Sequence, residues 1–243
     1  MTALAAASGV GIAGRLAPTD LALERGQMVA VIGPNGGGKT SLLRALARTE
    51  DAEGTVTIDG LDVDTTAEAR RRRLLAFLPA AREANWPVTV ADYLEFGLGS
   101  PDSARIDALI DLLELAALAD RPIDRISTGE RARAMLGRAI AGKARLLLLD
   151  EPLSNLDPYW VLRTVEIVHA EIAANVSAAL VSVHDLDMAR RFDRLLLVSG
   201  GALIADGVPS EVLESRAFGE AFRIGRQDGR WAITPPADRR SSR

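Results

Sequence analysis

The chain has 243 residues and no cysteine, which excludes disulfides and thiolate metal sites, and its formal net charge of −4 disfavours non-specific binding to nucleic acid. Hydrophobic residues make up 48% of it, enough for a substantial core. No apolar run approaches the roughly 20 residues that a membrane span needs, so we expect a soluble, cytoplasmic chain. Any role at a membrane would be peripheral.

The predicted elements begin after an alanine-rich start. Residues 1–10 have neither a basic segment nor a true apolar block, so we expect a frayed terminus rather than a signal peptide. Met28–Ile32 then reads as a buried strand, and the glycine-rich stretch 33–38 follows it. Ser41–Arg48 spaces its leucines as a helix does. The sequence therefore predicts strand, loop and helix in succession.

The middle of the chain changes from strands to helices. Gly54–Gly60 alternates with period two and ends in Asp-Gly, and Leu74–Leu78 is a short apolar strand. Residues 90–141 carry hardly any strand signal. Ser103–Leu118 predicts an amphipathic helix, and Gly129–Ala141 predicts a second long helix.

Strands return after the helical stretch. Leu146–Leu149 is a continuous apolar run, which is typical of a strand buried on both faces. Four further elements are predicted after it. They are a helix over Tyr159–Ala173, a strand over Ala179–Val183, a short helix over Met188–Arg191 and a strand over Leu195–Val198. The pattern predicts one α/β core interrupted by a helical insert.

The resulting single domain has three parts. We expect residues 1–80 and 144–217 to form the α/β core and residues 81–143 to form the inserted α-helical subdomain. Residues 218–243 are rich in glycine, arginine and proline, and we expect a loosely ordered tail there.

The glycine-rich stretch matches G-x-x-x-x-G-K-[ST], the P-loop pattern. The residues involved are Gly33, Pro34, Asn35, Gly36, Gly37, Gly38, Lys39 and Thr40, with Ser41 beside them. Glycines let backbone N–H groups surround phosphate oxygens, and the start of the next helix adds positive potential. Lys39 can bridge the β- and γ-phosphates of ATP, and the Thr40 hydroxyl can bind Mg²⁺. The alternative is a chance glycine turn, but the position between strand and helix favours the phosphate loop.

Acidic residues follow the buried strand at Leu146–Leu149. Such a strand places Asp150 and Glu151 at the carboxyl edge of the sheet, where ligands of open α/β sheets bind. Asp150 would hold Mg²⁺ and Glu151 would polarise the attacking water. His184 follows the next strand and could reach the γ-phosphate, although a lone histidine is more often structural.

These pieces occur in the order of one family, and the chain resembles the ATP-binding cassette (ABC) ATPases over nearly its whole length. The P-loop resembles their Walker A motif, Leu146–Asp150 with Glu151 their Walker B motif, and His184 their switch histidine. Ser154–Asp157 resembles the D-loop, and Ile126–Glu130 resembles the signature, usually Leu-Ser-Gly-Gly-Gln/Glu. The resemblance adds five candidate nucleotide contacts, Ser127, Thr128, Gly129, Glu130 and Asp157. The fold expected is a P-loop NTPase core with a mostly parallel sheet, a small antiparallel β region and the helical insert.

The resemblance implies partners and a location. Two copies would form a head-to-tail dimer in which Ser127 and Gly129 of one copy act on the γ-phosphate bound by the other. The helical insert would contact transmembrane permease subunits, holding the chain on the inner face of the membrane, and a substrate-binding protein would act indirectly. No specific nucleic acid is implied.

One branch of the family is the best match. Residues 78–90 and 183–189 resemble importers of iron chelates, haem, cobalamin or metal ions. Two alternatives stay open: an ABC ATPase of assembly or repair, for example iron–sulfur assembly, and a nucleotide switch with weak hydrolysis. The sequence does not name the transported substrate.

Three positions depart from the family pattern. Ala80 stands where the Q-loop glutamine is expected. Either coupling to metal and water is weaker, or a neighbour such as Arg82, Glu83 or Asn85 substitutes for the glutamine, and both alternatives stay open. Thr128 replaces a signature glycine, which is tolerated if its backbone is ordinary helix. No aromatic residue precedes Phe77 to stack on adenine, which leaves Arg15 or an aliphatic side chain near Ile12.

Two further features carry weaker signals. Arg70–Arg73 is a basic run, which we interpret as the solvated end of a helix. The alternative interpretation is a surface that contacts lipid headgroups or nucleic acid. Trp86, Tyr93 and Phe96 could line a groove for a permease helix or only pack the helical insert, and the sequence does not decide between these.

Overall fold

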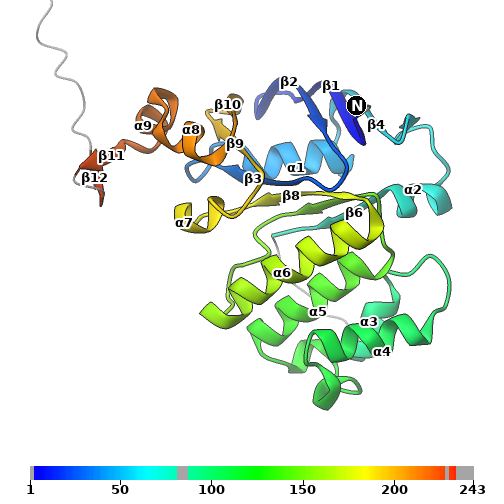
Figure 1. The fold of residues 1–243 in the computed structure, drawn as a ribbon. Helices are drawn as coiled ribbons and strands as arrows, with labels where there is room; N and C mark the ends of the chain where they lie inside the picture. Colours follow the sequence, from blue (N-terminus) through cyan, green and yellow to red (C-terminus); the bar gives the residue numbers. More distant parts are fainter. Residues whose placement is uncertain (1–2, 81–86, 228–229, 234–243) are drawn as a thin grey trace, which may run out of the picture.

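Three β-sheets organise the part of the chain that the computed structural model describes, residues 3–80, 87–227 and 230–233. They are a six-stranded sheet, a four-stranded sheet and a two-stranded hairpin. Helices cover both faces of the six-stranded sheet (Figure 1). This is the mixed α/β architecture that the sequence predicts.

The six-stranded sheet carries the loops that matter for function. Its strand order is β10 (Ala202–Gly207), β9 (Arg194–Ser199), β3 (Met28–Ile32), β8 (Ala178–Ser182), β7 (Leu146–Leu149) and β6 (Leu75–Leu78). Neighbouring strands are parallel except β9 and β10, which pair antiparallel. Every residue of β3, β7 and β8 is buried because layers pack on both faces, which explains their nearly unbroken apolar sequence.

The four-stranded sheet is antiparallel and covers helix α1 (Lys39–Ala47). Its order is β2 (Leu16–Leu23), β1 (Ala5–Ile12), β4 (Glu53–Ile58) and β5 (Leu61–Asp62). Figure 1 shows α1 lying between this sheet and the six-stranded one. One apolar cluster joins the helix to both sheets, with Val10 and Leu43 fully buried in it. The small antiparallel β region of the prediction is this sheet.

The predicted frayed start is wrong from Ala5 onward. Strand β1 pairs with β2 on one side and with β4 on the other, so it lies in the middle of its sheet. Ala5 and Ala7 are buried, whereas Ala6 between them is exposed. Alanine side chains are too small to make this period-two pattern stand out in the sequence, and the partner strands decide the conformation.

Helices make up the described stretch between β6 and β7. They are α3 (Val90–Glu95), α4 (Ser103–Leu112), two 3₁₀ turns (Ala116–Leu118 and Ile123–Arg125) and α5 (Thr128–Ala141). Within residues 87–143 the only β feature is an isolated bridge between Thr89 and Pro122. The helix predicted over Ser103–Leu118 ends earlier, because Glu114 adopts a left-handed φ of 52°. Leu113 and Leu115 remain fully buried.

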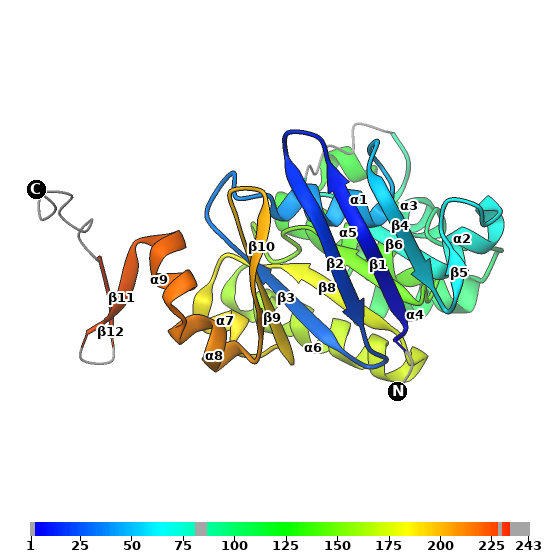
Figure 2. The ribbon, with the colours of Figure 1, turned by 90° about the horizontal axis from the view of Figure 1, so that it is seen from above.

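The remaining helices complete the layers. They are α2 (Glu68–Leu74), α6 (Pro158–Asn175), α7 (Leu186–Ala189), α8 (Pro209–Glu214) and α9 (Arg216–Phe222). A hairpin of β11 (Ile224–Gln227) and β12 (Arg230–Ile233) follows α9 and projects from the body in Figure 2. None of the described helices is long and apolar enough to cross a membrane.

The predicted loose order after Phe218 is wrong for the described residues there. Phe218 is only 1% exposed. Its ring centroid lies 4.8 Å from that of Phe222 and 5.2 Å from that of Trp231 in the hairpin. Aromatic packing therefore fixes this part of the chain against α9.

Candidate functional site

The glycine-rich loop leaves the carboxyl end of β3 and enters α1. Gly33 has a φ of 157°, and a Cβ atom there would lie 1.9 Å from the carbonyl oxygen of Val198 in β9. Gly38 has a φ of 111°, and its Cβ would lie 3.1 Å from Gly201 Cα. The loop can pass this close to β9 and its turn only because these residues lack a side chain.

Lys39 turns back into the loop that precedes it. Its ammonium group donates hydrogen bonds to the carbonyl oxygens of Gly33 at 2.8 Å and Pro34 at 3.3 Å. The side chain is buried, and this burial lowers its pKa, while the carboxylates of Glu151 and Asp150 act in the opposite direction. A buried cation inside a ring of backbone groups is suited to binding phosphate.

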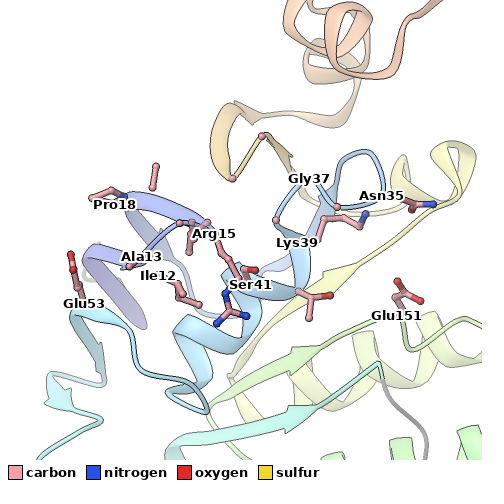
Figure 3. Close-up of a pocket in the computed structure, with 18 residues that line it drawn as sticks. Ile12, Ala13, Arg15, Pro18, Asn35, Gly37, Lys39, Ser41, Glu53 and Glu151 are labelled. Atoms are coloured by element: carbon pink, nitrogen blue, oxygen red, sulfur yellow. The ribbon is translucent and has the colours of Figure 1, made fainter.

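A cavity of about 710 Å³ opens in front of this loop (Figure 3). Its walls are formed by the turn between β1 and β2, the glycine loop, the turn between β9 and β10, and Glu151. The predicted residues among the lining are Asn35, Gly36, Gly37, Gly38, Lys39, Thr40, Ser41 and Glu151. Such a volume is in the usual range for small-ligand sites, about 300–1,000 Å³. Gly33 and Pro34 contribute through the carbonyl groups that hold Lys39.

Asp150 follows β7 and is 1% exposed. Its Oδ1 accepts a hydrogen bond of 2.7 Å from the Ser182 hydroxyl. Its Oδ2 is also buried, and no hydrogen-bond partner for it lies within the described residues. A buried carboxylate oxygen without a partner is costly unless a cation is bound. The residues present therefore fit an Mg²⁺ ion, which prefers oxygen ligands.

Ser182 is a functional residue that the sequence interpretation missed. Besides donating to Asp150, its hydroxyl oxygen accepts a hydrogen bond of 2.7 Å from the backbone N–H of Glu151. It stands at the end of β8 and is 1% exposed. The signal was a hydroxyl side chain at the end of an otherwise apolar buried strand, next to the edge where Asp150 was expected.

Glu151 and His184 meet at the carboxyl edge of the sheet. His184 Nε2 lies 2.7 Å from Glu151 Oε1. Glu151 adopts a left-handed φ of 51°, which is unusual for a residue with a long side chain. Strain of this kind is often kept at functional sites. The structure thus brings together two residues that the sequence placed after different strands.

Ala80 lies just beyond β6, two residues after Leu78, which contacts Asp150. The two strands are linked there by a 2.8 Å hydrogen bond from the Asp150 N–H to the Leu78 carbonyl. Alanine offers no polar side chain at this point. The proposed substitutes Arg82, Glu83 and Asn85 lie outside the described residues, as does Trp86.

Ser127 caps the start of α5. Its hydroxyl accepts from the Glu130 N–H at 3.3 Å, and the Glu130 carboxylate accepts from the Ser127 N–H at 2.7 Å. Hydrogen bonds to the Glu130 carboxylate, first from the backbone of Ser127 and then from its side chain, lower the pKa of Glu130. Thr128 is the first residue of α5 and has no positive φ, so the expectation of an ordinary helical start is confirmed.

The signature residues and the D-loop meet on one face of the chain but not at the cavity. A Cβ on Gly129 would lie 3.4 Å from the Asn155 carbonyl oxygen. Asp157 caps α6 by accepting from the Trp160 N–H at 2.9 Å. Neither Asp157 nor residues 127–130 line the phosphate-loop cavity in the described structure.

The far end of the cavity is formed by the β1–β2 turn. None of its described lining residues is aromatic. Arg15 points into this region, as Figure 3 shows, and forms an ion pair with Glu50. Glu50 also pairs with Arg44 of α1 at 2.7 Å. Ile12 lies beside them, so both residues proposed to face adenine line the cavity.

Comparison with protein families gives a direct match. The family model described as ABC transporter matches residues 16–154. The chain is 36% identical over 236 residues to the hemin import ATP-binding protein HmuV of Streptomyces coelicolor, covering 90% of this chain and 83% of that protein. It is 34% identical over 214 residues to the petrobactin import ATP-binding protein FpuC of Bacillus anthracis, covering 83% and 79%.

A longer relative and two solved structures agree with this. The cobalamin import ATP-binding protein BtuD of Halobacterium salinarum is 34% identical over 236 residues, and the match spans 90% of this chain but 59% of that protein. An ATP-binding subunit of an ABC transporter superposes with a TM-score of 0.77 at 23% identity, covering 90% and 94% of the two chains. A dimeric ATP-binding cassette bound to ADP and phosphate gives 0.75 at 20% identity, covering 84% and 98%.

Proposed function

The chain belongs to the ABC transporter family as an ATP-binding subunit, and we propose that it hydrolyses ATP to drive import of an iron chelate, haem, cobalamin or a metal ion. One observation carries the chemistry: Lys39, the glycine loop and Glu151 line the same cavity. The printed names of the three relatives support the direction and the range of substrates.

The phosphate chain of ATP lies along the glycine loop in this proposal. Backbone N–H groups of residues 35–41 and the Lys39 ammonium contact the β- and γ-phosphates, so Lys39 exchanges the carbonyl groups of Gly33 and Pro34 for phosphate oxygens. Mg²⁺, when bound, offsets phosphate charge. Asp150 Oδ2 and the Thr40 hydroxyl would hold it. Within the described structure no three acidic, histidine or cysteine side chains gather into a metal cluster.

Glu151 and His184 act on the reacting atoms. The Glu151 carboxylate orients the attacking water and accepts its proton, and His184 donates a hydrogen bond to the γ-phosphate. Their 2.7 Å contact holds His184 against Glu151, which lines the cavity, before ATP arrives. We propose these roles together with the nucleotide contacts made by residues 33–41.

The second half of each ATP site comes from another copy. Ser127 and Thr128 are exposed at the start of α5, and Gly129 follows them. The helix start supplies positive potential for the γ-phosphate of the facing copy, with Glu130 fixing the cap. Asp157 and the D-loop lie on the same face. We therefore propose a head-to-tail dimer with two shared sites.

The helical part, residues 81–143, is the proposed contact with transmembrane permease subunits. Through them the chain would lie on the inner face of the membrane, and a substrate-binding protein would act only indirectly. Of the aromatic residues considered for this contact, Tyr93 is buried and Phe96 is half exposed. Phe96 thus presents surface at the outside of the insert, whereas Tyr93 packs within it. Residues 1–80 and 144–217 form the nucleotide core in this division.

Ala80 favours a second candidate, a nucleotide switch with weak hydrolysis. A glutamine at this position would offer a polar group to Mg²⁺ and water, and alanine offers none. Steady-state release of phosphate from ATP by the purified chain separates the two candidates. Turnover of about 1 s⁻¹ or more, in the usual range of enzymes, supports the ATPase. ATP binding without measurable release supports the switch.

The transport assignment is tested in native membranes. The chain is purified gently with its partners from cells that carry either the natural sequence or Glu151→Gln. We expect a polytopic permease in both preparations and uptake of one substrate of the proposed group only with the natural sequence. Recovery of non-membrane partners alone would contradict transport and leave the ATP chemistry in place.

A further inference from the structure

A second cavity, of about 580 Å³, lies on the opposite edge of the six-stranded sheet. The first cavity is at the carboxyl ends of the parallel strands, whereas this one is at the amino ends of β6 and β7, next to Leu74 and Arg145. Helices α2 and α4, which contribute to its walls, lie at the same end of the molecule in Figures 1 and 2, away from α9. It is therefore separate from the phosphate loop.

The walls of this basic cavity gather cations from three segments of the chain. They are Arg70, Arg72 and Arg73 of α2, Arg105 of α4, and Lys143 and Arg145 before β7. Only two carboxylates, Asp59 and Asp102, line it. Since the whole chain carries a net charge of −4, this concentration of positive charge is local. The arginine run that we interpreted as a solvated helix end supplies half of it.

The two carboxylates do not neutralise the cavity. Asp59 is held by Arg145 at 2.8 Å and by Arg25 at 2.5 Å. Burial would raise the pKa of Asp59, but these two guanidinium groups more than offset it and keep the carboxyl ionised. Asp102 caps α4 by accepting from the Arg105 N–H at 2.9 Å. Both carboxylates therefore already interact with groups of the protein itself.

Three cations remain available to a ligand. The structure gives the side chains of Arg70, Arg73 and Lys143 no hydrogen bond or ion pair with any described residue, and all three are exposed at the cavity. Arg72 makes only an exposed pair with Glu68 one helical turn away, which contributes little. Like charges held this close repel one another, and a bound anion would relieve that repulsion.

We propose that this basic cavity binds a phosphate-bearing anion the size of an oligophosphate. Guanidinium groups match phosphate oxygens with paired hydrogen bonds, and an ammonium group adds a point charge. A partly open cavity of about 580 Å³ suits a small anion rather than an extended nucleic acid. The same chemistry is offered by a free oligophosphate and by the headgroup of an anionic lipid.

Calorimetric titration of the purified chain with inorganic tripolyphosphate, without Mg²⁺, tests the proposal. We expect two binding sites, one in each cavity. Lys39→Ala should remove only the phosphate-loop site. The double variant Arg73→Ala with Lys143→Ala should remove only the other, because two unpaired contacts each contribute about tenfold in affinity. Loss of binding at the phosphate loop is thus distinguishable from loss of binding at the basic cavity.

The matched control removes two cations elsewhere. Arg163 is partly exposed and Arg216 is exposed, and neither lines the cavity. Among the described residues each pairs only within its own helix. Their double substitution by alanine should leave both sites intact. Arg73→Lys with Lys143→Arg should keep measurable binding, since the charges are retained. Thermal unfolding and ATP binding should be unchanged in the Arg73/Lys143 variant, because both side chains are exposed.

The source of the anion is tested with phosphatidylglycerol vesicles. Sedimentation with vesicles that depends on Arg73 and Lys143 identifies a lipid headgroup as a ligand, whereas tripolyphosphate binding alone identifies a free oligophosphate. If the Arg73→Ala, Lys143→Ala variant binds both probes like the natural chain, or if neither probe occupies a second site, the proposal is overturned.

Discussion

The Ser182 hydroxyl donates a 2.7 Å hydrogen bond to Asp150 Oδ1 in a position where both residues are 1% exposed. The same hydroxyl accepts from the Glu151 N–H, so one side chain on β8 fixes two consecutive residues after β7. With Oδ1 held in this way, Oδ2 is the oxygen left for a cation. The orientation of Asp150 therefore depends on a neighbouring strand.

Ser182→Ala should weaken both folding and metal use. It leaves a buried carboxylate oxygen and a backbone N–H without their partner, which costs about 1–3 kcal/mol in the free energy of unfolding. We expect the Mg²⁺ concentration for half-maximal ATP hydrolysis to rise several-fold, while Ser182→Thr, which keeps the hydroxyl, stays close to the natural chain. Denaturant unfolding and Mg²⁺ titration of the rate measure the two effects. If Ser182→Ala has the same unfolding free energy and the same Mg²⁺ dependence as the natural chain, Ser182 plays no part in the site.

Glu151→Gln should stop turnover without preventing nucleotide binding. The amide keeps the size of the side chain but cannot accept the proton of water, and general-base catalysis contributes about 10²–10⁴-fold to a rate. Phosphate release should fall by at least that factor, while the dissociation constant for ATP stays within about threefold. Glu166→Gln, on the exposed part of α6, is the control and should change neither. Unchanged turnover in Glu151→Gln would exclude Glu151 as the base.

Lys39→Ala should abolish stabilisation by nucleotide. A ligand at 100 times its dissociation constant stabilises a protein by about 2.7 kcal/mol, and ATP should raise the unfolding temperature of the natural chain accordingly. Without the ammonium group that faces the loop, the same ATP concentration should give little or no rise. Differential scanning calorimetry with and without ATP measures this. An equal rise in both proteins would show that ATP binds elsewhere.

The phosphate site was predictable because its requirements are local. Only glycine tolerates the backbone of Gly33 beside β9, and the strand before it and helix after it are clear in the sequence. That Glu151 and His184 come together follows from a general rule, since parallel strands end at one edge of a sheet. Such relations need no knowledge of the tertiary contacts.

Other features depend on contacts between distant segments. The conformation of Ala5–Ile12 is decided by β2 and β4, because alanine carries little hydrophobic signal of its own. Phe218 is buried by Phe222 and by Trp231 in a hairpin that follows it. The role of Ser182 appears only once β8 lies beside β7. Their partners, not their own sequences, determine these outcomes.

Asp59→Asn should destabilise the fold at neutral pH but not in acid. The pKa of Asp59 lies below its ordinary value of 3.8, because hydrogen bonds from Arg145 and Arg25 outweigh the effect of burial. A carboxylate with a lowered pKa stabilises the folded state above its ordinary pKa, and this contribution is lost as pH falls through the lowered value. The difference in unfolding free energy should be about 1 kcal/mol at pH 7 for such partly exposed pairs. It should shrink steadily below pH 3.8.

Urea unfolding of both proteins across this pH range measures the difference. Asparagine tolerates the left-handed φ of 51° at this position, so the backbone is not a confounding factor. Asp120→Asn, at an exposed carboxylate for which the described structure gives no ion pair, should show no such pH dependence. A constant difference for Asp59→Asn down to strongly acid pH would mean that its ion pairs contribute nothing.

Arg15→Ala should weaken binding of ATP, because Arg15 is the planar side chain at the end of the cavity where the base would lie. Stacking on a base contributes about 1–3 kcal/mol, so the dissociation constant should rise about tenfold, and Arg15→Tyr should restore it. The link from Glu50 to α1 survives through Arg44, so the variant should fold normally. Fluorescence titration with an ATP analogue measures the affinity, with Arg216→Ala as the control. Equal affinity in Arg15→Ala and the natural chain would assign the base contact to the aliphatic residues around Ile12 instead.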